Sequence, residues 1–346
     1  MACDAGMKAP IAALLCVLLV SLLSGSHASQ ADEAAVRFVY DDLRAFAQAH
    51  RSIVAGTPAL EAFQQYVASA SPAFAFYARR YGATAESIAG QYAQRPKYYA
   101  YVAALEPKLR ELESTIAAGV RELSSLTGIR EAPPVFYLVA NQTAGGTPAE
   151  LDAAGTLGVA VGLDALAISP EVDLSEFPAG IGGRGRLADL PQVVVHETVH
   201  LQQVKAQGGL DNYRSIYRPG EANSNLAVAI REGFAEYATW LAAGARLGDR
   251  HLYGEAHERE LWAAFRPVMH DKAFSTPGWF GAPDAAHPDW PPQIGYWLGL
   301  AMCEHYHRSS TDPAGAWREL MSAYRRAELD KIAAAYERKF SGDAAN

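Results

Sequence analysis

Residues 192–205, QVVVHETVHLQQVK, place two histidines four positions apart with a glutamate directly after the first. On a helix, side chains at positions i and i+4 project from the same face, with Cβ atoms about 5–6 Å apart. His196 and His200 could therefore reach one metal ion at the usual Zn–N distance of about 2.0–2.1 Å. Glu197 would lie close enough to accept a proton from water on that ion. The spacing is typical of a zinc peptidase site, with two ligands and a general base on one turn.

The same five residues also arise by chance in proteins that bind no metal, so the prediction requires a third ligand. The metzincin class is excluded, because Gln203 and Ala206 stand where that class needs glycine and histidine. Further along, SNLAVAIREGFAEYATWLAAG (residues 224–244) predicts a second helix with Ser224 or Asn225 as its N-cap.

Glu232 and Glu236 stand at i and i+4 on this second helix, next to an apolar packing face. A solvated acidic face would explain them, but carboxylates on a partly apolar face are costly unless paired or bound to a cation. We expect Glu232 to be the third zinc ligand and Glu236 to accept the free ring N–H of a zinc-binding histidine. Gly233 would let this helix approach the first one closely. Glu221, in the loop RPGEANSN, is the competing third ligand.

The two segments together resemble a known family. HETVH followed by EGFAEY is similar to the gluzincin zinc metallopeptidases, among them the aminopeptidases of the aminopeptidase-N type, and closest to bacterial predicted zinc-dependent proteases. The resemblance implies that the glutamate before the glycine, here Glu232, is the third ligand. The insert between the two segments, residues 201–231, is longer than in the aminopeptidases, which keeps Glu221 open as an alternative.

A third segment extends the resemblance, which covers about residues 131–310 through three short motifs. PPQIGYWLGLAMCEHY places Tyr296 and Gly299 in a Tyr-x-x-Gly pattern at the start of a predicted helix. In the aminopeptidases a tyrosine in such a pattern points at the reacting carbonyl oxygen. By this resemblance Tyr296 would donate its hydroxyl to the developing oxyanion. Because the chain has 17 tyrosines, most of which should be core residues, this role depends on Tyr296 facing the metal.

The elements that position these residues follow from the hydrophobic pattern. Residues 31–129 predict helices, with Pro107 as a break. Two apolar, β-branched runs, residues 134–141 and 155–166, predict strands joined by a glycine turn at residues 144–150. We expect the second of these strands to offer its edge to an extended peptide.

The helix that carries the two histidines should begin at Asp189 or Leu190 and end at Gly208-Gly209. Together these elements predict an α+β fold, a mostly helical zincin-like metalloprotease domain with a small mixed β-sheet. We expect three parts: a signal peptide (1–28), an N-terminal helical region (29–130) and the catalytic domain (131–346).

Composition limits the partners. The chain has 346 residues, of which 50% are hydrophobic and 20% charged, as in ordinary globular proteins with a sizeable core. The formal net charge is −8 and no block of five or more basic residues occurs, which excludes nucleic-acid binding through a basic patch.

The N-terminus is typical of a bacterial signal peptide. A lysine precedes an apolar run over residues 9–23, and residues 26–28 satisfy the small-x-small rule for cleavage after Ala28. Cleavage leaves Cys303 as the single cysteine, so the mature chain has no intramolecular disulfide. We expect a periplasmic or secreted protein without a membrane span after signal removal.

The sequence therefore predicts a zinc-dependent peptidase that acts on a peptide or protein. Zinc held by His196, His200 and Glu232 would keep its fourth position open for water, whose proton Glu197 would take and pass to the leaving amine. The alternative is a non-catalytic periplasmic binding or assembly protein with a structural metal. Glu197 argues against this alternative, because a structural metal site has no use for a general base. A structural site also prefers a fourth protein ligand, often cysteine, and Cys303 is the only candidate.

Overall fold

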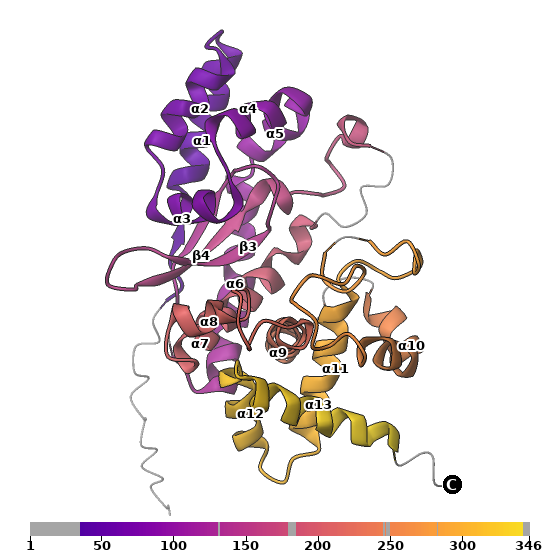
Figure 1. The fold of residues 1–346 in the computed structure, drawn as a ribbon. Coiled ribbons are helices and arrows are strands. Elements are labelled where there is room, and N and C mark those ends of the chain that lie inside the picture. Colours follow the sequence, from indigo (N-terminus) through magenta and orange to yellow (C-terminus); the bar gives the residue numbers. More distant parts are fainter. Residues whose placement is uncertain are drawn as a thin grey trace, which may run out of the picture. The chain divides into compact units, whose positions relative to one another are not determined.

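A small mixed sheet lies among the helices of the fold (Figure 1). The computed structural model describes residues 35–130, 132–178, 185–244, 246, 250–281 and 283–341. The strands are β1 (Phe38–Val39), β2 (Val135–Leu138), β3 (Gly146–Glu150) and β4 (Leu157–Gly162). Their order is β1-β2-β4-β3, in which β1, β2 and β4 run parallel and β3 runs antiparallel to β4.

Helices account for most of the described chain, which confirms the predicted α+β class with a small mixed sheet. Before β2 they are α1 (Asp41–Val54), α2 (Ala59–Ala68), α3 (Pro72–Tyr81), α4 (Ala85–Gln94), α5 (Pro96–Ala103) and α6 (Glu106–Thr127). After β4 they are α7 (Leu190–Ala206), α8 (Leu210–Ser215), α9 (Asn225–Ala243), α10 (Arg250–Phe265), α11 (Ile294–Arg308), α12 (Pro313–Ser322) and α13 (Arg326–Ser341). Short 3₁₀ turns are η1 (Leu163–Ala165), η2 (Leu174–Glu176) and η3 (Leu187–Asp189).

The first helix starts later than the pattern predicted. Phe38 and Val39 form β1, which pairs in parallel with the first residues of β2, and α1 begins only at Asp41. An aromatic and a β-branched residue next to each other suit a strand, and only the distant partner β2 decides between strand and helix here. The break at Pro107 is confirmed, because this residue lies in the first turn of α6.

The prediction of a glycine turn over residues 144–150 is also wrong, because residues 146–150 form β3. Pro148 in the middle of β3 is tolerated because β3 is an outer strand of the sheet. The prediction that the strand at residues 155–166 offers a free edge is also wrong. β4 lies between β2 and β3, so the strand with an unpaired edge near the histidines is β3.

Helices α3 and α7 cover opposite faces of the sheet. A Cβ at Gly146 would lie 2.6 Å from Cγ of Glu197 on α7. Gly146 pairs with Val161, and a Cβ at the next residue, Gly162, would lie 2.8 Å from the hydroxyl of Tyr77 on α3. Because neighbouring residues of a strand point to opposite faces, the sheet separates α3 from α7. Figure 1 accordingly shows α1–α5 on one side of the sheet and α7 and α9 on the other.

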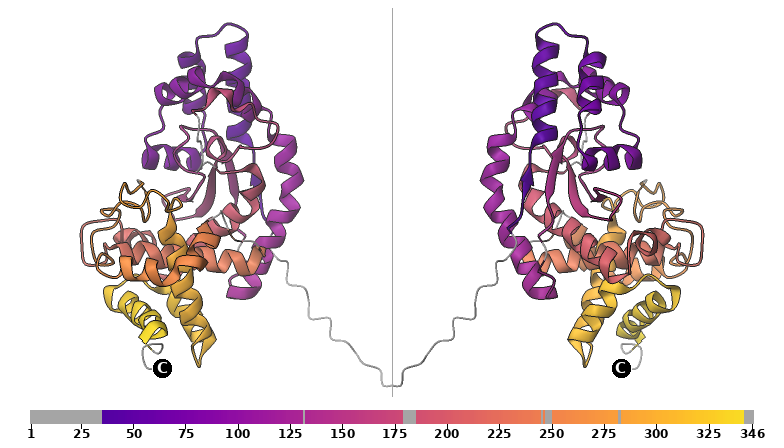
Figure 2. Two further views of the ribbon diagram at one scale, coloured as in Figure 1. Left: turned by 90° about the vertical axis from the view of Figure 1, so that its right-hand side faces the viewer. Right: turned by 90° about the vertical axis from the view of Figure 1, so that its left-hand side faces the viewer.

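The two helices that carry the predicted ligands are central to the core. From Leu190 to Val204, α7 is buried on nearly every side. The side chain of Ser224 caps α9 by accepting a hydrogen bond from the backbone of Ala227, as expected. Asp189 precedes α7, but its side chain pairs with Arg186 instead of capping the helix. Figure 2 shows α6 running beside the sheet to reach these helices, and it packs against both α7 and α9.

Gly233 permits a close approach, but to a different helix from the one predicted. A Cβ at Gly233 would lie 2.0 Å from the carbonyl carbon of Gly299 on α11, and a Cβ at Gly299 would lie 1.8 Å from the carbonyl oxygen of Ala229. The glycines therefore bring α9 against α11. Helix α9 also contacts α7, but the atoms nearest to a Cβ at Gly233 belong to α11.

The predicted signal peptide, residues 1–28, lies outside the described residues. Among the helices that the structure describes, none is both long enough and apolar enough to cross a membrane.

Candidate metal centre

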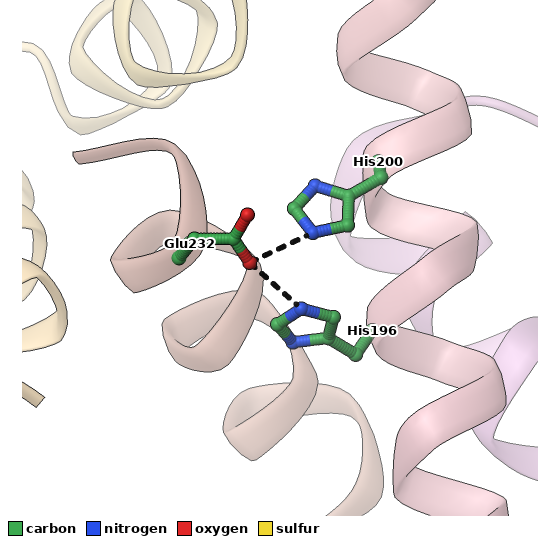
Figure 3. A group of neighbouring side chains, drawn as sticks. All are labelled: His196, His200 and Glu232. Atoms are coloured by element: carbon green, nitrogen blue, oxygen red, sulfur yellow. Dashed lines mark hydrogen bonds and ion pairs between the residues drawn. The ribbon is translucent and has the colours of Figure 1, made fainter. Parts of the chain in front are cut away.

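His196 and His200 from α7 and Glu232 from α9 point toward one another (Figure 3). Oε2 of Glu232 lies 3.4 Å from Nε2 of His196 and 3.1 Å from Nε2 of His200. Ligand atoms of a tetrahedral ion at about 2.0–2.1 Å would lie about 3.3–3.4 Å apart, close to these distances. All three residues are buried. Among the described residues, they are the group of histidine and carboxylate side chains placed to hold a metal ion.

The tautomer of His200 is fixed in the form that a metal needs. The Nε2 amide of Gln203 donates to the backbone carbonyl of Arg231, so its Oε1 faces Nδ1 of His200 at 2.7 Å as an acceptor. Nδ1 must then carry a hydrogen, so Nε2 faces Glu232 either with a second proton or with its lone pair. A lone pair facing a carboxylate repels it unless a proton or a cation lies between them. The donor set therefore fits a bound cation.

Glu232, and not Glu221, is the glutamate at this centre. Oε1 of Glu232 accepts a hydrogen bond of 3.2 Å from the hydroxyl of Tyr217, which leaves Oε2 for the histidines. Glu221 is exposed in the turn before α9 and does not belong to the group.

The charges of this group are coupled. Burial by itself would lower the pKa of His196, but its hydrogen bond to Glu232 and the nearby carboxylates raise that pKa to about 8. Burial likewise opposes ionisation of Glu232, but the charge of His200 and the histidine hydrogen bonds hold its pKa well below the usual range. The carboxylate is thus ionised and attracts positive charge, as a metal ligand must.

Glu197 has a different environment although it is adjacent to His196 in the chain. It is buried against Gly146 of β3 and forms no hydrogen bond with a described residue. Burial raises its pKa, Glu232 adds to the rise, and the two histidines and Arg80 act against it. An unpaired carboxylate with a raised pKa is a stronger proton acceptor than an exposed one.

Glu236 lies beside His196 but pairs with another residue. Its Oε1 accepts a hydrogen bond of 2.5 Å from Arg250 at the start of α10, and lies 3.9 Å from Nδ1 of His196. The pKa of Glu236 is lowered despite its burial, first of all by the charge of Arg250. The distance to His196 exceeds that of a hydrogen bond. Nδ1 of His196 is buried without a partner in the described chain.

Tyr296 lies in the first turn of α11, close enough to the centre for Glu232 to affect its hydroxyl. Burial raises the pKa of Tyr296 well above its usual value, and Glu232 and Tyr217 raise it further. Its hydroxyl forms no hydrogen bond with a described residue and is therefore free to donate to another group.

Cys303 does not belong to the centre. Its thiol is fully buried on α11 and donates to the carbonyl of Ile230 over 3.6 Å. The described chain therefore supplies three ligand side chains, and a fourth protein ligand is absent from the group.

The insert between the two motifs is organised by Arg231. Its buried guanidinium donates to the carbonyl of Tyr213 and, over 2.9 Å, to Oε1 of Gln207. The ring of Tyr213 packs against that of His200, with centroids 6.0 Å apart. Arg231 thus fixes the turn after α7 and α8, and this arrangement places Tyr217 on Glu232.

Sequence reasoning missed Gln203 and Tyr217. Gln203 stands three residues after His200, on the same face of the helix, which is a signal that could have been used. Tyr217 lies in a segment without periodicity, so nothing in the sequence indicated its contact with Glu232.

A scan against protein-family models, a search of curated proteins and a search of solved structures each found no match to this chain.

Proposed function

We propose that the protein is a zinc-dependent peptidase of the gluzincin type, with His196, His200 and Glu232 as ligands. The observation that carries the proposal is the position of Glu197. Its buried carboxylate forms no hydrogen bond with a described residue and lies on the same stretch of helix as two ligand residues. A structural metal site has no use for such a group.

Each residue around the proposed metal site has a distinct role. Gln203 holds His200 in the ligand tautomer, and Tyr217 orients Glu232. A zinc ion in this group would supply a Lewis acid that makes a water molecule acidic enough to lose its proton near neutral pH. Glu197 accepts that proton and delivers it to the leaving amine. Tyr296 donates its free hydroxyl to the oxygen that gains negative charge during attack.

The outer edge of β3 is suited to hold the substrate. Gly146 brings the β3 backbone against Glu197, so an extended peptide paired with this edge would pass the base. Main-chain hydrogen bonds along the edge would bind the peptide whatever its side chains.

The competing function is that of a binding or assembly protein with a structural metal. It is less well supported, because the group has three ligand side chains and Cys303 bonds elsewhere.

The decisive experiment compares wild type with Glu197→Gln on a diverse peptide library. The substitution keeps the shape of the side chain and removes the base. We expect the variant to hold zinc normally and to lose about 10²–10⁴-fold in kcat, the contribution of general-base catalysis. Zinc-loaded wild type that cleaves no peptide would support the structural-metal function instead.

A further inference from the structure

A pocket lined by arginines lies next to the metal centre. It has a volume of about 370 Å³. Three segments far apart in the sequence form it: α3, the end of β3, and α8 with the residues that follow it. The lining residues are Phe76, Arg79, Arg80, Glu150, Arg214, Tyr217 and Arg218.

The pocket is strongly cationic although the protein is acidic. Four arginines face one glutamate in a chain whose formal net charge is −8. Arg79, Arg80 and Arg214 form no ion pair with any carboxylate of the described residues, and Arg218 pairs only with the exposed Asp211, at 3.2 Å. Unneutralised cations gathered in one concave site raise the local concentration of anions.

Two arginines of the pocket are positioned by contact with the same aromatic ring. The guanidinium carbon of Arg214 lies 5.2 Å from the centroid of the Phe76 ring, and that of Arg79 lies 6.0 Å from it. Phe76 itself is buried. Such contacts hold the guanidinium groups near fixed positions, which favours bidentate binding of a carboxylate.

The pocket shares residues with the centre. Tyr217 lines the pocket and donates its hydroxyl to Glu232. Arg80 lines the pocket and acts electrostatically on Glu197. Glu150 ends β3, whose first residue, Gly146, touches Glu197. Since a strand rises about 3.4 Å per residue, a peptide along β3 would pass from the base to the pocket within about four residues.

We propose that this pocket is a specificity site that binds a carboxylate of the substrate, so that peptides with an acidic side chain or a free C-terminal carboxylate near the scissile bond are preferred. This inference rests on the proposed peptidase function for its place in a reaction. The carboxylate forms charge-assisted hydrogen bonds with Arg79, Arg80 and Arg214, and Tyr217 places it beside the metal centre.

The first experiment uses zinc-loaded protein and matched peptides in which each position around the cleaved bond carries Glu or Gln, with the C-terminus as a free acid or an amide. We expect wild type to prefer the charged partner of one pair by about 10–100-fold in kcat/KM. The pair that discriminates identifies the source of the carboxylate. Equal cleavage of every pair overturns the inference and leaves the peptidase function intact.

Variants then assign the preference to the pocket. In Arg79→Ala/Arg214→Ala the preference should fall to about threefold or less, and in Arg214→Glu it should move toward a peptide with Lys at the same position. Arg121→Ala is the matched control, because Arg121 is exposed on α6 and forms no ion pair in the described chain. If Arg121→Ala lowers the preference as much as the pocket variants do, the effect is one of net charge and the inference is wrong.

The second experiment measures binding without cleavage. The preferred charged peptide (Glu or free acid) and its neutral partner (Gln or amide) are titrated into zinc-loaded Glu197→Gln, with and without the Arg79→Ala/Arg214→Ala changes. We expect tighter binding of the charged peptide by about 10-fold or more, lost when the two arginines are removed. If wild type cleaves nothing, all the Glu/Gln and free-acid/amide pairs of the first experiment are titrated instead. Arginine-dependent binding then supports the pocket while the peptidase function fails, and equal binding within every pair overturns the pocket.

Discussion

The amide oxygen of Gln203 lies 2.7 Å from Nδ1 of His200, and the amide nitrogen of the same side chain donates to the carbonyl of Arg231. Because its amide nitrogen already donates to the carbonyl of Arg231, the amide oxygen of Gln203 can only accept a hydrogen bond from Nδ1 of His200. The histidine is therefore held with its other nitrogen free to bind a cation. Carbonyl and carboxylate partners of this kind commonly orient the histidines of metal sites.

Gln203→Met should weaken metal binding by about 10–100-fold, as the loss of such partners usually does. The hydrogen bond that fixes the tautomer disappears, whereas the side-chain volume hardly changes. Competition of the purified protein with a zinc chelator measures the affinity. Gln202→Met is the matched control, because the Gln202 amide is buried on the same helix without a hydrogen-bond partner in the described chain. Equal losses in both variants would show that the effect comes from packing.

Glu232→Gln should remove one bound zinc per chain, and Glu221→Gln should leave the metal content unchanged. The neutral amide keeps the shape of Glu232 but loses the charge that offsets the ion. Glu221 is exposed outside the group. Metal analysis of both dialysed variants checks the assignment. Loss of zinc in Glu221→Gln alone would contradict it.

Glu236→Ala should lower the free energy of unfolding by about 3–5 kcal/mol, because it leaves a largely buried arginine without its partner. The side chain of Arg250 is only 12% exposed and that of Glu236 is 2% exposed. Urea denaturation measures the loss, and Glu236→Ala/Arg250→Ala should recover much of it. If Glu236→Ala instead keeps full stability and loses metal affinity, its main partner is His196.

Gly233→Ala should destabilise the protein by about 1–3 kcal/mol, the usual cost of overpacking. The new methyl group would meet the backbone of α11, which cannot move without shifting the whole helix. The matched control is Gly90→Ala in α4, where a Cβ meets no atom within 4 Å. Because alanine favours helices, that change should stabilise by about 0.5–1 kcal/mol. Denaturant midpoints of the two variants should therefore move in opposite directions.

Tyr296→Phe should reduce kcat by about 10²–10³-fold while the zinc content stays constant, because one oxyanion donor is removed. Tyr217→Phe should act differently: it removes the hydrogen bond to Glu232 and should lower zinc affinity first. Turnover at saturating zinc, measured beside zinc titrations, separates the two effects. An unchanged kcat in Tyr296→Phe would exclude it as a donor.

Local pattern was enough to predict the helices of the centre. His196 and His200 lie on one helical face because of their spacing alone. Ser224 caps the N-terminal end of α9, and Gly244, in the left-handed conformation, ends the helix. Glu232 was predictable because a carboxylate on a buried helix face requires a cation or a partner. These inferences depend on residues within a few positions of each other, where helix geometry fixes distances.

Contacts between distant segments were decided only by the tertiary structure. β1 and β3 are strands because β2 and β4 lie beside them, although their own residues suggested a helix and a turn. Gly233 faces α11 instead of α7 because of which helix packs on which side, and one helix alone does not contain that information. The arginine pocket is the clearest case. Its cations are Arg79 and Arg80 from one segment and Arg214 and Arg218 from another, more than a hundred positions later. The two segments meet only in the folded chain, where Arg231 ties the second of them to Gln207.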